Sequence, residues 1–264
     1  MQSLTGESRI EKVERRVVKD AFSPHRHDTY TIALTVSGVQ AFNYLRELRH
    51  SLAGQAMILH PDELHDGHSC DEAGFAYRAA YVPPADIQMV VDCDPLPFLS
   101  GGISADPALV GAVGRLLDSC EPGSARLAYE DALFDLVKAM APAAPCAGKS
   151  ARTNREAVMR VRQFLDTVPA PGTGLAEMEA IAGYDRWQLS RDFRRILGTS
   201  PYRYLQCRRI DRAKQLLREG ASLAAAAHDA GFADQSHFGR EFRKTFGMSP
   251  LAWHRAERMR TIVL

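Results

Sequence analysis

The C-terminal part of the chain contains the same helical segment twice, 49 residues apart. Residues 189–201 read LSRDFRRILGTSP and residues 238–250 read FGREFRKTFGMSP. Two arginines, a phenylalanine, a glycine, a serine and a proline coincide when the copies are aligned, and a Gly-aromatic pair precedes each copy. Two small helical units that each present arginines are suited to holding one long polymer at two places, and DNA is the polymer that we expect.

The first copy has the pattern of a helix-turn-helix unit. Residues 175–182 predict a short helix that Gly183 ends in the left-handed conformation, and Asp185 is placed to cap the helix that follows. On this second helix the apolar side chains share one face, which holds Leu189, Phe193 and Leu197. In such a unit the first helix supports the second, and the second enters the major groove.

The second copy repeats this pattern. Residues 224–227 predict the supporting helix, Gly231 the turn and Asp234 the next cap. The apolar face of its second helix holds Phe238, Phe242 and Phe246. Between the copies, residues 202–217 predict one long helix that keeps the two reading helices at a fixed separation, so that both reach one face of a duplex about one turn apart.

The arginines of the two copies fall at two kinds of position. Arg191 and Arg240 occupy equivalent places near the helix starts and suit bidentate contact with guanine. Arg194, Arg243 and Lys244 come later on their helices and suit phosphates. The exact repeat of the first pair argues against arginines that are merely solvated.

The first half of the chain changes character. Residues 31–36, 56–59 and 75–82 are short β-rich runs between Gly and Pro breaks, a pattern typical of a small barrel or sandwich. Residues 106–140 then take a helical period and predict two amphipathic helices. Their apolar stripes serve either as core or as a face for a second subunit, and the sequence leaves both readings open.

Composition supports a division into two domains. Residues 142–153 are mostly small, contain proline and lack periodicity, so we expect a linker there between domains at 1–141 and 154–264. Residues 1–150 hold 13 Lys+Arg and 20 Asp+Glu, a net charge of −7, whereas residues 151–264 hold 20 and 12, a net charge of +8; together these give the +1 of the whole chain. Only the second half is therefore expected to meet phosphate.

The second half resembles the DNA-binding domain of the AraC family of transcription activators. The motifs that carry the resemblance are AIAGYDRWQLSRDFRRILGTSPYRYLQCRRIDRAKQLL and AAAHDAGFADQSHFGREFRKTFGMSPLAWHR. Taken with the positions argued above, the resemblance implies double-stranded DNA and RNA polymerase as partners. The residues expected on DNA are Arg186, Trp187, Ser190, Arg191, Arg194, Gln235, Ser236, Gly239, Arg240, Arg243 and Lys244. A packing role for Trp187 is the alternative reading, which its place on the polar face disfavours.

The first half resembles the cupin-like sensor domain of the same family through HRHDTYTIALTVSG and LAGQAMILHPDELHDG. The implied fold is α+β with two domains: an N-terminal cupin-like β-barrel with two flanking helices, and a C-terminal all-α domain of two helix-turn-helix units joined by a linker helix. The resemblance implies a small-molecule effector inside the barrel, held by His25, His27, Tyr30, Ser37, His65, Tyr77 and Ala79. Arabinose-type sensors carry an arginine where Ser37 stands, which argues against a sugar.

A metal-dependent cupin enzyme or sensor, joined to DNA-binding helices, is the alternative function. Metal-bearing cupins carry an HxH pair, a following glutamate and a later histidine; His25, His27 and His65 could supply the three imidazoles. No glutamate follows the pair, because Thr29, Tyr30 and Thr31 stand there. We therefore expect no cofactor and no enzymatic activity, with these histidines as the candidates if a metal binds.

The remaining signals concern location and assembly. The five cysteines are scattered and form no CxxC pair, which predicts reduced thiols in a cytoplasmic protein. Residues 1–16 are too polar for a signal peptide, and no apolar run approaches the roughly 20 residues that span a bilayer. We expect no membrane partner, and a homodimer if the stripes of residues 106–140 are left uncovered.

Overall fold

The structure is a computed structural model that describes residues 10–18, 22–90, 96–121, 125–143, 153–167 and 173–262, with the side chains of 256 and 258–262 left undescribed. Cys93, Cys146 and most of the expected linker lie outside these residues. The thiols of Cys70, Cys120 and Cys207 are free. Across the described ranges, no helix combines the length and apolar character needed to cross a membrane.

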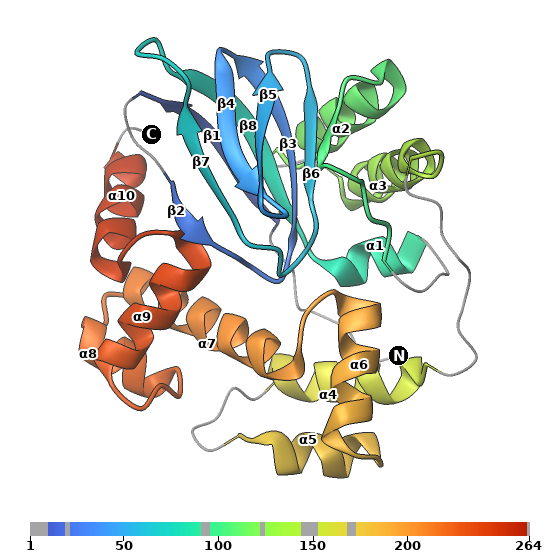
Figure 1. Ribbon diagram of the computed structural model, residues 1–264. Coiled ribbons are helices and arrows are strands. Elements are labelled where there is room, and N and C mark those ends of the chain that lie inside the picture. Colours follow the sequence, from blue (N-terminus) through green and yellow to red (C-terminus); the bar gives the residue numbers. More distant parts are fainter. Residues whose placement is uncertain are drawn as a thin grey trace.

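Nine strands in the described part of the first half form two antiparallel sheets that face one another (Figure 1). The first sheet has the order β1-β8-β3-β6-β9 and the second the order β2-β7-β4-β5. The strands are β1 (Glu11–Val17), β2 (Phe22–His25), β3 (Tyr30–Ser37), β4 (Val39–Tyr44), β5 (Glu47–Leu52), β6 (Ala56–Leu59), β7 (His65–Ser69), β8 (Phe75–Val82) and β9 (Ile103–Ser104). The three predicted β runs are β3, β6 and β8.

Strand β3 separates two apolar layers by simple alternation. Tyr30 and Ile32 join the core on its outer side, whereas Ala33 joins the core between the two sheets. Phe42 and Tyr44 reach that inner core from the opposite sheet. Consecutive strand residues point to opposite faces of a sheet. Since the residues on both faces of β3 are buried, both sides of this sheet are covered.

Three helices cover the outer face of the first sheet: α1 (Pro84–Val90), α2 (Pro107–Ser119) and α3 (Arg126–Met140). The predicted stripes of α2 and α3 pack against one another and the sheet in a single core, so their role as core is now settled. Its helical members include Leu109, Val113, Leu116, Leu117, Leu133, Leu136, Val137 and Met140. The short α1 was not predicted.

The second half is helical throughout its described residues. Its helices are α4 (Arg155–Thr167), α5 (Leu175–Ala182), α6 (Arg186–Leu197), α7 (Pro201–Arg218), α8 (Leu223–Asp229), α9 (Gln235–Phe246) and α10 (Pro250–Ile262). The predicted pair of helix-turn-helix units and their linking helix are confirmed as α5–α6, α8–α9 and α7. Tyr204 and Leu205 of α7 belong to the core of the first unit, whereas Ile210, Ala213 and Leu217 belong to the core of the second.

Both reading helices begin and end as their sequences predict. The carboxylate of Asp185 accepts hydrogen bonds from the backbone N–H groups of Trp187 and Gln188 at 2.9 and 3.0 Å, and Asp234 accepts one from His237. Gly183, between α5 and α6, has φ of 81°, which an L side chain strains to adopt. The shared cores and the capped ends together set the orientation of α6 relative to α5 and of α9 relative to α8.

The C-terminal ends of both reading helices touch the barrel. Gly198 ends α6 and Gly247 ends α9, each with positive φ. A Cβ atom at Gly198 would lie 3.0 Å from the Cβ of Pro61, and one at Gly247 would lie 2.9 Å from the carbonyl oxygen of Ser23. The two glycines therefore serve both the turn and the close approach of the sensor half.

We predict that Gly247→Ala destabilises the full chain more than Gly183→Ala does. Both variants strain a left-handed residue, which costs about 1–2 kcal/mol, but a Cβ at Gly183 meets nothing within 4 Å. Gly247→Ala also forces the end of α9 away from Ser23. Urea unfolding measured on both variants tests this, and equal losses would show that the barrel yields without cost.

Candidate DNA-binding surface and interdomain pocket

Helices α6 and α9 bury one face and present the other to solvent. The fully buried side includes Leu189, Phe193, Phe238 and Phe242. The residues expected on DNA lie on the other side: Arg186, Trp187, Arg191, Arg194, Gln235, Ser236, Arg240, Arg243 and Lys244 are exposed, and Ser190 and Gly239 are partly exposed. The structure thus brings the predicted residues onto two helix faces that are free of the apolar core.

Trp187 settles one alternative left by the sequence. Its side chain is 67% exposed, so it does not pack in the core. The guanidinium of Arg186 lies 5.5 Å from its ring. A large exposed aromatic beside a cation at the start of α6 is available to a partner.

The arginines differ in their local partners. Arg191 donates to the side-chain oxygen of Gln188 at 2.7 Å, and Arg194 donates to the hydroxyl of Ser190. The side chain of Arg240 makes no hydrogen bond or ion pair with any described residue. These contacts between exposed groups are weak, so a phosphate or base can replace them.

Helix α7 turns a different basic face toward the barrel. Three of its cations pair with carboxylates of the first half, and none of the three side chains is more than 28% exposed. The pairs are Arg203–Asp62, Arg208–Asp28 at 2.9 Å and Lys214–Glu11 at 2.8 Å. The positive charge of the second half is therefore not used only to bind phosphate. Part of it, on α7, pairs with carboxylates of the first half and holds the two halves together.

Two of these pairs change the pKa of their members. Burial raises the pKa of Asp62, an effect that the Arg203 guanidinium opposes. Burial disfavours the charge on Arg208, but the carboxylates of Asp28 and Asp211 outweigh it and raise the pKa of this arginine well above its ordinary value. Helix α7 thus stays cationic where it meets the barrel.

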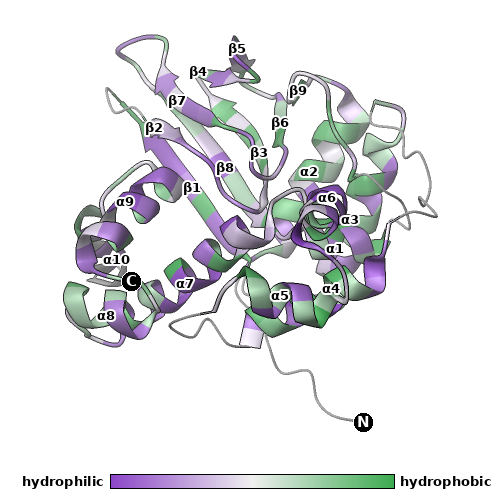
Figure 2. Ribbon diagram, turned by 60° about the horizontal axis from the view of Figure 1, so that its bottom comes forward, coloured by the Kyte–Doolittle hydropathy of each residue, from purple (hydrophilic) through white to green (hydrophobic). Residues whose placement is uncertain are grey.

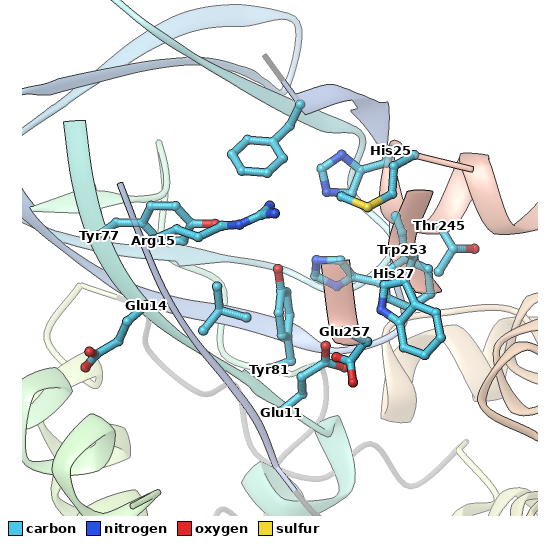
Figure 3. A pocket seen from close by; sticks show the side chains of 14 residues that line it. Glu11, Glu14, Arg15, His25, His27, Tyr77, Tyr81, Thr245, Trp253 and Glu257 are labelled. Carbon is cyan, nitrogen blue, oxygen red and sulfur yellow. The ribbon is translucent and has the colours of Figure 1, made fainter. Parts of the chain in front are cut away.

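A pocket of about 410 Å³ lies where the barrel meets α9 and α10 (Figure 3). One wall of the pocket is formed by β1, β2, β8 and the residues that follow β2. The barrel residues that line it include Val13, Phe22, His25, His27, Tyr77 and Tyr81. Its other wall comes from the helical half, with Thr245, Phe246, Met248 and Trp253. The volume fits a small organic molecule, and the aromatic residues provide apolar contact area.

The charged residues at this pocket are unequally satisfied. The carboxylates of Glu11, Glu14 and Glu257 pair with cations, among them Lys214, Lys12 and Arg218. Arg15 also lines the pocket, with its guanidinium 5.8 Å from the ring of Phe22, and it pairs with no carboxylate of the described residues. Among the described residues that line the pocket, Arg15 is therefore a cation without a carboxylate partner, beside apolar walls.

Three of the predicted ligand residues meet beside this pocket. His25 at the end of β2 is the register partner of His65 at the start of β7, and their ring centroids are 4.5 Å apart. His27 lies 5.0 Å from His65. Burial lowers the pKa of His25 and His27, and burial with repulsion from His25 lowers the pKa of His65 to about 3, so all three rings are neutral near pH 7.

The remaining predicted ligand residues fall into two groups. Tyr77 lines the pocket with His25 and His27. The expectation that Tyr30, Ser37 and Ala79 line the same site is not met here. The Tyr30 hydroxyl donates to the Pro97 carbonyl at 2.7 Å within the outer core, Ser37 is exposed, and Ala79 is buried in the inner core. Alternation along β3 explains Tyr30, because neighbouring residues reach opposite sides of the sheet.

Sequence reasoning missed the helical wall of the pocket. Phe246 was assigned to the core of the second unit, and Thr245 and Trp253 were given no role. Arg15 was missed because β1 reads EKVERRV, a mostly charged run with only two valines. The spacing of these valines was the available signal, since a strand places Arg15 on the same side as Val13 and Val17.

Comparison with known proteins agrees with this two-part arrangement. Residues 9–135 match the AraC-like ligand binding domain, and residues 178–256 match a helix-turn-helix domain. The HTH-type transcriptional regulator YbfI of Bacillus subtilis is 23% identical over 235 residues, which cover 86% of this chain and 85% of that protein. The HTH-type transcriptional activator RhaS of Pectobacterium carotovorum is 24% identical over 265 residues, covering 90% and 89%.

Solved structures share the whole fold. ToxT from Vibrio cholerae O395 superimposes with a TM-score of 0.67 at 12% identity, over 93% of this chain and 97% of that one. ToxT from strain SCE256, solved with an unsaturated fatty acid bound, gives a TM-score of 0.63 at 11% identity, over 93% and 94%. The two domains define a DNA-binding transcriptional regulator with a ligand-binding domain. This chain belongs to the AraC family.

We predict that Arg191→Ala and Arg240→Ala each cost about 1–3 kcal/mol on the specific DNA site and relax preference at separate base pairs roughly 10 bp apart. Arg194→Ala and Arg243→Ala are the matched controls, expected to weaken all sequences alike and to reduce the salt dependence of binding. Selection of bound sites from random DNA measures both effects. If the first pair of variants selects the parental sequence, these arginines do not read bases.

Proposed function

We propose that this protein is a transcriptional activator controlled by a small effector that binds in the interdomain pocket. The observation that carries the proposal is the origin of the pocket walls. One wall comes from the barrel, and the other comes from α9 and α10, so that an occupant contacts the sensor half and a reading helix at once (Figure 3). Such a ligand shifts any equilibrium in which these two walls separate.

On the DNA side, we propose that α6 and α9 each enter the major groove, with Arg191 and Arg240 reading bases. Trp187, Ser190, Gln235, Ser236 and Gly239 then approach base edges or sugars, and Arg186, Arg194, Arg243 and Lys244 hold phosphates. Their exposure on two helices linked by the rigid α7 supports this assignment.

For the effector, we propose an organic anion with an apolar body. Arg15 is the lining cation that no carboxylate of the described residues pairs with, whereas the lining carboxylates are paired. Phe22, Phe246 and Trp253 supply the apolar contact. The unsaturated fatty acid held by ToxT, a protein of the same fold, is a ligand of this chemistry.

The wider assignments rest on the family. The activator role and contact with RNA polymerase are proposed by analogy with RhaS, which is named as an activator. Because the apolar stripes of α2 and α3 are buried in the core, a homodimer would instead use another face of α3, where Leu127 and Phe134 are 66% and 56% exposed. We assign no catalytic residue, and we place the protein in the cytoplasm with the DNA that it binds.

We predict that Arg15→Gln weakens binding of an acidic effector about tenfold or more, because a hydrogen bond to a charged group contributes about 1.5–3 kcal/mol. Arg16→Gln is the matched control, since adjacent strand residues point to opposite faces and Arg16 is not among the pocket-lining residues. The probes are long-chain and aryl-substituted carboxylic acids with their alcohols. Binding is read from the fluorescence of Trp253 in a Trp187→Phe background, since the chain holds two tryptophans.

The same acids should change the affinity of the full chain for its DNA site, and the alcohols should not. Alcohols that bind as tightly as acids, or an acid affinity that Arg15→Gln leaves unchanged, would contradict the effector assignment. An acid that binds without altering DNA affinity would contradict control through this pocket.

A further inference from the structure

Three histidines from separate parts of the barrel converge beside the pocket. His25 ends β2, His27 follows in the connection to β3, and His65 begins β7. Each offers a ring nitrogen, and these nitrogens all lie within 4.8 Å of one another. All three side chains are at least nine-tenths buried, with exposed fractions of 9%, 7% and 6%. Three buried polar rings in such proximity need a physical reason, because burying a ring nitrogen costs free energy unless it has a partner.

The hydrogen bonds of the rings fix which nitrogen is free. The Nδ1 atoms of His25, His27 and His65 lie 2.8, 2.9 and 2.9 Å from the backbone carbonyl oxygens of Ser23, Thr29 and Glu63. A carbonyl only accepts, so each Nδ1 carries the proton and each Nε2 keeps its lone pair. Histidines that bind metals are oriented in this way, with the second ring nitrogen donating to a carbonyl.

The free lone pairs lack partners at two of the three rings. The Nε2 atoms of His25 and His65 make no hydrogen bond to any residue in the described ranges. The Nε2 atom of His27 accepts from the hydroxyl of Thr31 at 3.0 Å. Thr31 occupies part of the stretch where metal-bearing cupins carry a glutamate, and here it leaves a neutral site of imidazoles.

We propose that His25, His27 and His65 bind a divalent metal ion such as Zn²⁺ or Co²⁺ through their three Nε2 atoms. Bonds of about 2.0–2.1 Å at tetrahedral angles put such nitrogens about 3.4 Å apart, so small rotations of the rings close the site. His25 and His27 also line the pocket, which leaves the fourth position for water or an oxygen of a pocket ligand. Three imidazoles without thiolates favour these ions over Mg²⁺ or Ca²⁺.

The geometry of the rings and of the carbonyls that hold them carries the site. This inference goes beyond the proposed function and does not depend on it. Binding of DNA or of an acidic effector can be measured separately from binding of metal.

The site also adjoins the second reading helix. A Cβ at Gly247 would lie 3.3 Å from the Nδ1 atom of His25, and the N–H of Arg26 donates to the carbonyl of Lys244 at 2.9 Å. A metal that joins β2 to β7 would therefore fix the strand on which the end of α9 rests.

The test uses the untagged full chain, stripped with a chelator and titrated with Zn²⁺ by calorimetry and with Co²⁺ by visible absorption. We expect about one equivalent of metal per chain and the d–d bands of nitrogen and oxygen coordination. Metal that binds only weakly or without fixed stoichiometry would overturn the proposal. A strong near-ultraviolet charge-transfer band would do so as well, because it would place the metal on cysteine thiolates.

Variants then locate the ligands. His25→Gln and His65→Gln should each weaken Zn²⁺ binding more than the roughly 100-fold that changes around a metal site cost. His68→Gln, on the same strand β7 but outside the cluster, is the matched control and should bind like the parent. Parental affinity in His65→Gln would overturn the proposal. Should a variant fail to fold, histidine ¹⁵N spectra of the parent decide, because Zn²⁺ should shift the Nε2 signals of three rings and shifts confined to other rings contradict it.

Discussion

Helix α7 is the element on which the rest of this structure depends, because it belongs to three packing units at once. Its first half completes the core of one helix-turn-helix unit, and its second half completes the core of the other. Its remaining face carries Arg203, Arg208 and Lys214 to carboxylates of the barrel. The spacing of the two reading helices and their attachment to the sensor half are therefore properties of one rigid helix (Figure 2 shows its mixed polarity).

The close approach of the two halves gives the sensor a physical route to the DNA-binding surface. Gly198 and Gly247 bring the ends of α6 and α9 against the barrel, and the pocket opens beside the second of these contacts. A ligand or metal there acts on groups that are already packed against α9. Coupling between sites requires an element with two arrangements that both sites bias, and we place the proposed coupling at the contact between β2 and the end of α9.

Much of the helical half could be predicted because its signals are local. The caps Asp185 and Asp234, the stripe Phe238–Phe242 and the turn at Gly183 each depend on residues within one or two helical turns. The barrel and pocket depended on pairing across long distances, so only the apolar strands β3, β6 and β8 were recognised. The interdomain pocket joins Arg15 to Trp253, and no pattern along the chain relates residues that far apart. The three histidines were identified, but their shared orientation became visible only through the carbonyls that hold them.

Ion pairs between α7 and barrel carboxylates hold the sensor half to the reading helices. Thermal unfolding of Asp28→Asn against Asp211→Asn tests it most directly, because both carboxylates contact the same Arg208, at 2.9 and 3.1 Å, but only Asp28 comes from the barrel. Asp28 is 8% exposed and Asp211 is 50% exposed. Removing one partner of a buried pair costs about 3 kcal/mol, and each kcal/mol shifts the melting temperature of a chain of this size by roughly 2–4 °C. We expect Asp28→Asn to lower the melting temperature by several degrees and Asp211→Asn to change it little; equal shifts, or none for Asp28→Asn, would contradict the account.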